Sequence, residues 1–262
     1  MWHLGSTQMQ QLTGVQRTSQ GNRWLGYLLA FNAGALNAGG FMVLQVYTSH
    51  MTGFVSTLAD QLVLGNTALV LGAMGALLAF GAGAACAAIM VHWARHRQLH
   101  STYALPLLLQ AGLMLLFGLV GAVTMDWHTW FAVPLTVLLL SFMMGVQNAT
   151  LTKMSQASVR TTHMTGVVTD LGMELGKLLY WNRSGPDAPQ YVRANTARMA
   201  LLSGLLGLFL LGGVVGAWSF QHWGFVCVLP LAVAVMAVSL PPLYCDVQRL
   251  RQQRAKRFPF SD

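Results

Sequence analysis

Long apolar blocks alternate with short polar connections along most of this chain. The blocks are about 20 residues long, the length with which an α-helix crosses the hydrocarbon core of a bilayer. Six such blocks are present, at residues 24–45, 67–94, 101–124, 129–150, 197–219 and 222–243. This pattern predicts an all-α polytopic membrane protein with six transmembrane helices, whose apolar surface faces lipid and neighbouring helices.

Two shorter stretches follow the first and fourth blocks, and each begins with nearly the same polar phrase. The phrase SHMTG stands at residues 49–53, and THMTG stands at residues 162–166. The stretches behind them are short for a crossing and carry Asp60 in the first case, and Asp170 and Glu174 in the second. We expect two re-entrant or broken helices, because irregular backbone at membrane depth is tolerated only inside protein or beside a water-lined cavity. Two full additional spans are the alternative.

The order of these parts repeats along the chain. Gly34 and Asn37 in the first block have the same spacing as Gly145 and Asn148 in the fourth, and a phrase, a short helix and two further blocks follow each pair. Each repeat therefore contains three spans and one short helix. Because three is odd, the second repeat is expected to be inverted relative to the first. Inverted 3+3 repeats with broken helices recur in secondary transporters, with the binding site near the bilayer midplane.

The positive charge indicates orientation in the membrane rather than a nucleic-acid partner. Only 8% of the residues are charged, and the net charge of +8 comes from 15 basic and 7 acidic residues. The connections TMDWH and FQHWG contain no Lys or Arg. Because Lys and Arg are retained on the cytoplasmic side, both termini are predicted to be cytoplasmic. The predicted division is a cytoplasmic tail at 1–23, membrane repeats at 24–124 and 125–243, and a basic cytoplasmic tail at 244–262.

The two phrases supply the candidate binding chemistry. A hydroxyl of Thr48 or Ser49, and one of Thr161 or Thr162, is expected to cap a helix that begins at the following histidine. The N-terminus of a helix favours an anion or a carboxylate, and a histidine there can bind a solute or carry a proton near neutral pH. The predicted substrate-binding residues are Asn37, His50, Thr52, Gly53, Asn148, His163, Thr165 and Gly166. The structural alternative is that these groups only satisfy buried backbone between helices.

Two carboxylates share a face of the second short helix with the histidine of its phrase. Asp170 and Glu174 follow His163 at helical spacing, and we expect them to take up a proton when the solute binds. If they turn into the cavity they favour a cation instead. The alternative for Glu174 is a solvated pair with Lys177, three residues on.

Other classes of site are disfavoured. His92, His96 and His100 have helical spacing, but Arg95 and Arg97 intervene and a carboxylate partner is missing, so no metal or other cofactor is predicted. No motif supplies a paired nucleophile and base. The predicted partners are the lipid bilayer and a small-molecule solute, with no nucleic acid, and a homo-oligomer is left open.

The residues around both phrases resemble a known family. AFNAGALNAGGFMVLQVYTSHMTG together with MGVQNATLTKMSQASVRTTHMTGVVTDLG is similar to the YoaK family of bacterial inner-membrane proteins, over about residues 24–243. In that family an asparagine commonly follows the first phrase, where Phe54 stands here, and an aspartate is common where Asn37 stands. The resemblance implies a membrane location and confers no substrate.

The leading hypothesis for function is a small secondary transporter or channel for a small solute that can be anionic, with a midplane site formed by the two HMTG phrases. A membrane-embedded enzyme and a non-catalytic membrane assembly partner are the alternatives. Flux into proteoliposomes distinguishes the first hypothesis from the other two.

Overall fold

The structure is a computed structural model that describes residues 19–99, 101–126, 132–154, 163–182 and 190–257. Within these residues all regular secondary structure is helical. The elements are α2 (Ser19–Leu44), α3 (Met51–Leu64), α4 (Thr67–His96), α5 (Ala104–Asp126), α6 (Ala132–Met154), α7 (Met164–Leu179), α8 (Thr196–Trp223), the 3-10 turn η1 (Gly224–Cys227) and α9 (Val228–Arg257). The predicted all-α class is confirmed. The predicted N-terminal tail lies almost entirely outside the described residues.

Four segments of the described chain are long and apolar enough to cross a membrane. They are Thr67–His96, Ala104–Ala122, Leu135–Met154 and Thr196–Arg249, the last of which covers both α8 and α9. Helix α2 is not among them, and it carries three asparagines, Asn22, Asn32 and Asn37, within its sequence. Helices α3 and α7 have 14 and 16 residues, fewer than the roughly 20 that a crossing requires.

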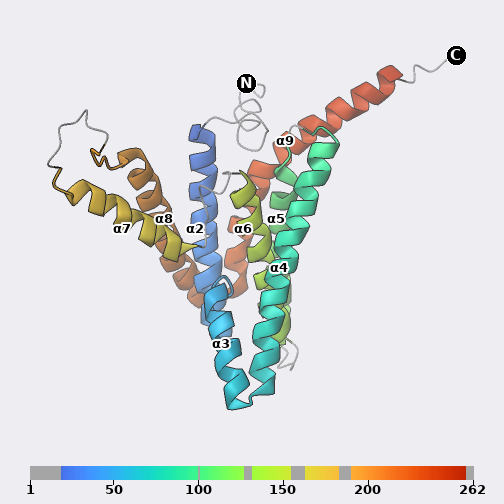
Figure 1. The fold of residues 1–262 in the computed structure, drawn as a ribbon. Helices are drawn as coiled ribbons and strands as arrows, with labels where there is room; N and C mark the ends of the chain where they lie inside the picture. The colour runs from blue at the N-terminus through green and yellow to red at the C-terminus, as the bar shows by residue number, and fades with distance from the viewer. Residues whose placement is uncertain (1–18, 100, 127–131, 155–162, 183–189, 258–262) are drawn as a thin grey trace.

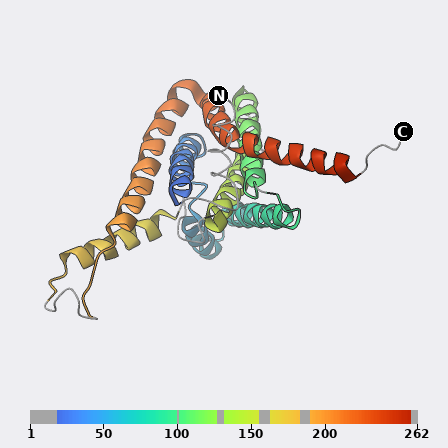
Figure 2. The same ribbon diagram turned by 90° about the horizontal axis from the view of Figure 1, so that it is seen from above.

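The long helices form a bundle from which two hairpins project (Figures 1 and 2). Within the bundle α2 packs against α8, α4 against α6, and α5 against α9. The hairpins are formed by α3 with α4 and by α7 with α8. The start of α2 and the end of α9 lie toward the same end of the molecule, at the top of Figure 1.

Helices α2 and α8 cross with their backbones in direct contact. A Cβ atom on Gly34 of α2 would lie 2.0 Å from the carbonyl oxygen of Phe209 in α8. A Cβ atom on Gly212 of α8 would lie 2.1 Å from the carbonyl oxygen of Phe31 in α2. No side chain fits at such distances, so this crossing requires glycine on both helices.

Helices α4 and α6 cross in the same manner. A Cβ atom on Gly145 of α6 would lie 2.1 Å from the carbonyl oxygen of Phe80, and one on Gly83 of α4 would lie 2.0 Å from that of Phe142. The α6 residues stand 111 positions after their counterparts in α2, and the α4 residues stand 129 positions before theirs in α8. The two crossings therefore use matching positions of the chain.

The helices α4 and α8 also begin in the same way. Asn66 and Asn195, again 129 residues apart, are their N-cap residues. The side-chain oxygen of each accepts a hydrogen bond from the backbone N–H three residues later, in Leu69 and Arg198. This satisfies one of the N–H groups that the first turn of a helix leaves without an intrahelical partner.

Polar side chains join the helices inside the bundle. The Gln110 amide of α5 donates to the Gln147 side-chain oxygen of α6 at 2.6 Å, and the Gln147 amide donates to the carbonyl oxygen of Leu29 in α2 at 2.7 Å. Both glutamines are fully buried. Interhelical hydrogen bonds of this kind add to van der Waals packing in lipid, where a hydrophobic force between helices is lacking.

Helix α9 extends beyond the predicted span and into the predicted C-terminal tail. It continues through Pro241 and Pro242 to Arg257, and Figure 1 shows it turning away from the bundle. Asp246, in this extension, is buried and accepts hydrogen bonds from the backbone N–H and the hydroxyl of Ser101 ahead of α5. A contact between residues 145 positions apart holds the extension, which the apolar pattern alone could not indicate.

The glycine crossings predict a sharp difference between two alanine variants of α4. Gly83→Ala should lower the thermal unfolding temperature, because overpacking at a close contact costs about 1–3 kcal/mol. Gly81→Ala is the matched control: nothing lies within 4 Å of its Cβ position, and alanine favours the helix there. Thermal unfolding of the purified protein in detergent measures both. Equal destabilisation by the two variants would contradict a role for Gly83 in the crossing.

Candidate functional site

Both phrases mark the beginning of a short helix. Helices α3 and α7 start directly after His50 and His163, which are their N-cap residues. The backbone angles of the two histidines are similar, with φ −92° and ψ 73° for His50 and φ −86° and ψ 57° for His163. The repeated phrase therefore specifies a repeated local conformation.

The predicted hydroxyl cap is wrong at the first phrase. The Ser49 hydroxyl donates to the side-chain oxygen of Asn37 at 2.8 Å, and the Ser49 backbone N–H donates to the same oxygen at 3.3 Å. No side chain caps α3, and the Thr48 hydroxyl is buried without a partner in the described residues. The Ser49 hydroxyl therefore binds the Asn37 side chain instead of the first turn of α3. Thr161 and Thr162 lie outside the described residues.

The glycine of each phrase makes room for its histidine ring. A Cβ atom on Gly53 would lie 2.8 Å from Nδ1 of His50, and one on Gly166 would lie 2.3 Å from Cδ2 of His163. Each imidazole therefore folds back over the first turn of its own helix. Thr52 and Thr165, next to the glycines, are exposed.

A cavity of about 380 Å³ adjoins the second phrase. Its lining comes from α4, from α6 and from the start of α7: Phe80, Ala84, Ala88, Asn148, Ala149, Thr152, Lys153 and His163. Two predicted site residues, Asn148 and His163, are thus brought together. No residue of the first phrase lines this cavity, and Asn37 is held by Ser49 instead. In both views of the molecule, however, α7 begins near the junction of α2 and α3 (Figures 1 and 2). A site shared by the two phrases stays a prediction.

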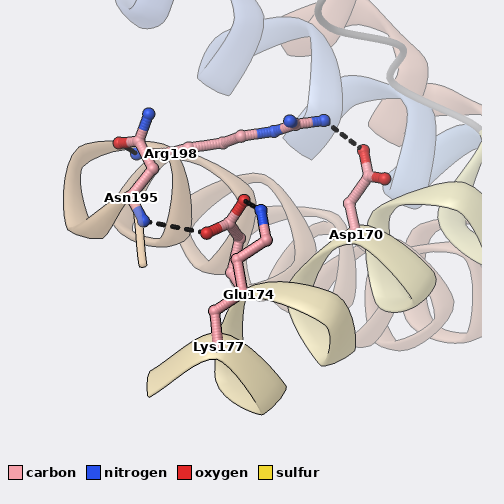
Figure 3. Close-up of polar contacts among 5 residues, drawn as sticks. All are labelled: Asp170, Glu174, Lys177, Asn195 and Arg198. Carbon is pink, nitrogen blue, oxygen red and sulfur yellow. Dashed lines mark hydrogen bonds and ion pairs between the residues drawn. The ribbon is translucent and has the colours of Figure 1, made fainter. Parts of the chain in front are cut away.

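The two carboxylates of α7 contact the neighbouring helix rather than the cavity (Figure 3). The carboxylate of Glu174 is buried and accepts from the Lys177 ammonium at 2.9 Å and from the Asn195 backbone N–H at 2.8 Å. Asp170 pairs with Arg198 of α8 at 2.8 Å. The hydrogen bond from the Asn195 N–H, followed by that from Lys177, lowers the pKa of Glu174 below its ordinary value of 4.5. These contacts dock α7 onto α8, and a proton-coupling role for the two carboxylates stays a prediction.

The comparisons with known proteins agree with the fold. Residues 25–240 match a family described as a protein of unknown function, DUF1275. The chain belongs to this family. It is also 25% identical over 157 residues to the UPF0700 transmembrane protein YoaK of Bacillus subtilis (strain 168), a match that covers 60% of this chain and 68% of that protein. The resemblance to the YoaK family is therefore confirmed, and the protein is a multi-pass membrane protein. No solved structure matches the chain significantly.

Sequence reasoning misses two residues of this family member that lie at or beside the cavity. In the sequence Lys153 is only one of the 15 basic residues whose charge indicates orientation, and His92 belongs to a disfavoured metal site. The Lys153 ammonium lies 2.8 Å from Nε2 of His92, and Lys153 lines the cavity. In the sequence, the one local indication that these residues belong to the site is that Thr152 and Lys153 lie about one helical turn after Asn148 on α6.

The folded-back imidazole predicts a difference between two glycines of α7. Gly166→Ala should push the His163 ring off its position, and an off-rotamer side chain costs about 0.5–1.5 kcal/mol. The rate of modification of His163 by diethyl pyrocarbonate, followed by mass spectrometry, should change. Gly172→Ala, with nothing within 4 Å of its Cβ position, should leave the rate as in the wild type. An unchanged rate in Gly166→Ala would refute the assigned role of the glycine.

The contacts of Glu174 predict a pH-dependent stability. Because folding lowers the pKa of this carboxyl, its ionised form stabilises the folded protein above the ordinary value of 4.5, and that contribution is lost as the pH falls through the lower folded value. Glu174→Gln should therefore lower the unfolding temperature near neutral pH, and the difference from wild type should shrink below pH 4.5. The control is Asp60→Asn, which removes an exposed carboxylate of α3. A difference that persists at low pH would contradict the assignment.

Proposed function

We propose that this family member is a small secondary transporter or channel of the bacterial inner membrane. It moves a small solute, for which an anion is favoured, through a bundle of two inverted halves. Each half, residues 24–124 and 125–243, contributes three full spans and one short helix.

The observation that carries this proposal is the pair of matched helix crossings. The first helix of each half packs against the second long helix of the other half, as α2 does with α8 and α6 does with α4. The same positions of the chain provide the glycines in both crossings. In Figure 1 α2 runs away from the end at which α9 finishes, and α6 runs toward it. Matched helices of opposite direction support an inverted repeat, the architecture of many secondary transporters.

The proposed topology has six full spans with both termini cytoplasmic. The four apolar segments cover α4, α5, α6, α8 and α9, and α2 is the remaining span. The start of α2 and the end of α9 lie toward the same end of the bundle, in agreement with an even number of crossings. The absence of basic residues from TMDWH and FQHWG supports a cytoplasmic position for both termini.

The proposed transport site lies where α3 and α7 begin. The N-terminus of each short helix is partially positive and carries a histidine, so the site favours an anion or a carboxylate. The eight substrate-binding residues predicted from the sequence keep that assignment here. If solute binding disrupts the contacts that keep Asp170 and Glu174 ionised, either carboxylate could take up a proton. This would weaken the ion pairs to Arg198 and Lys177, and so would loosen α7 from α8. Transport would thereby respond to pH.

Uptake of a panel of small anions and cations into proteoliposomes tests this function. Between roughly pH 5.5 and 8, where histidine titrates, anion uptake should increase as the pH falls and should be lost in His50→Ala and His163→Ala. The control is His222→Ala, which changes an exposed histidine at the end of α8. A cation preference that depends on Asp170 and survives both histidine substitutions would exclude the proposed anion site.

The alternatives give different results in the same preparations. Turnover of a substrate in detergent, without a second compartment, would favour a membrane-embedded enzyme. If neither turnover nor uptake is observed, the role of a non-catalytic membrane assembly partner remains.

A further inference from the structure

The cavity beside the second phrase has one apolar wall and one polar edge. Phe80, Ala84 and Ala88 of α4 form the apolar wall, whereas Thr152 and Lys153 of α6 bring a hydroxyl and an ammonium group. Its volume of about 380 Å³ lies near the lower end of the roughly 300–1,000 Å³ of small-molecule sites. The space therefore suits a small ligand with an apolar body.

The positive charge of Lys153 is not neutralised by any carboxylate in the described residues. Its ammonium group lies 2.8 Å from Nε2 of His92 and can donate a hydrogen bond to that ring nitrogen. Acidic side chains elsewhere have other contacts: Asp170 binds Arg198, Glu174 binds Lys177, and Asp246 binds Ser101. Lys153 brings a positive charge to a cavity whose lining contains no carboxylate. Opposite charges attract, so this cavity favours an anion.

The matching place in the first half lacks the hydroxyl and the charge that α6 brings to the cavity. Phe41 and Met42 stand 111 residues before Thr152 and Lys153. The Phe41 ring stacks on Tyr47 with a centroid separation of 4.3 Å. Asn37, the counterpart of Asn148, is occupied by Ser49. The two halves thus share a backbone arrangement and differ in chemistry, and the cation is confined to the second half.

We propose that this cavity binds a small organic anion with an apolar body, whose charged group contacts Lys153. His92 acts as a positioning residue that holds the ammonium group at the cavity edge. His163, at the start of α7, adds a further polar group to the lining. Only the role of this ligand as cargo rests on the proposed transport function, because binding is a property of the cavity alone.

A series of ligands with one shape and three charges tests the proposal. Benzoate, benzyl alcohol and benzylammonium are titrated into the purified full-length protein in a non-ionic detergent, and binding is measured by isothermal titration calorimetry. Benzoate should bind most tightly. Lys153→Met, which installs the side chain found at position 42, should weaken benzoate at least about tenfold, the loss expected for a charge-assisted hydrogen bond. It should leave benzyl alcohol nearly unchanged.

Three variants separate the charge from general effects on the protein. Arg193→Met removes an exposed cation outside the cavity and should leave benzoate binding unchanged. Lys153→Arg keeps the charge and should retain binding within a few-fold. Thr152→Phe, which introduces the side chain that position 41 carries in the first half, should fill the cavity and abolish the binding of both benzoate and benzyl alcohol. Loss of benzoate binding in Arg193→Met, or its full retention in Lys153→Met, would overturn the proposal.

Two further measurements distinguish the source of the anion and the fate of the ligand. Lys153-dependent retention of phosphatidylglycerol in nanodiscs, with no binding of benzoate, would overturn a small-ligand site in favour of a lipid. Lys153-dependent binding of benzoate in detergent with no anion uptake by proteoliposomes would support the cavity assignment and overturn transport. Benzoate uptake that is unchanged in Lys153→Met would overturn the cavity assignment and leave transport standing.

Discussion

The backbone contact between crossing helices is the constraint on which the rest of the structure depends. In lipid the helices gain no hydrophobic stabilisation by leaving the solvent, so they associate through close packing and interhelical hydrogen bonds. Gly34 and Gly212 allow this approach between α2 and α8, and Gly83 and Gly145 allow it between α4 and α6. Because α3 packs on α4 and α7 packs on α8, these crossings also determine where the two short helices begin.

Local packing explains why glycine follows histidine by three residues in the HMTG phrase. This explanation is compatible with a binding role for the histidine. A histidine at the N-cap position can lie over the first turn only if the residue three positions later has no side chain, as at Gly53 and Gly166. The ring makes no capping hydrogen bond in either helix. Among the described residues no side chain caps either helix, so the first N–H groups of α3 and α7 could donate to a ligand at the proposed site.

The sequence predicts what depends on local periodicity and misses what depends on contacts between distant residues. The block at 67–94 anticipates α4 within two residues of its ends. The extension of α9 escapes the apolar pattern because its support is the contact of Asp246 with Ser101. The candidate site divides in the same way. The phrases predict where the short helices start, and two residues predicted for the site, Asn148 and His163, line one cavity. The pairing of Lys153 with His92, 61 residues away, exists only because α4 and α6 cross.

Unequal chemistry on matched halves has a consequence for the proposed transporter. If both halves were chemically identical, the inward-open and outward-open states of an inverted repeat would be equivalent and nearly equal in free energy. A ligand shifts such an equilibrium only by as much as its affinity differs between the two states. Lys153 of α6 lies beside His92 of α4, whereas Met42 holds the matching position in the first half. The two states of the proposed transporter would therefore present this charge differently. An anion that neutralises Lys153 would then stabilise one state selectively, and the different chemistry of the two halves would set the direction of that response.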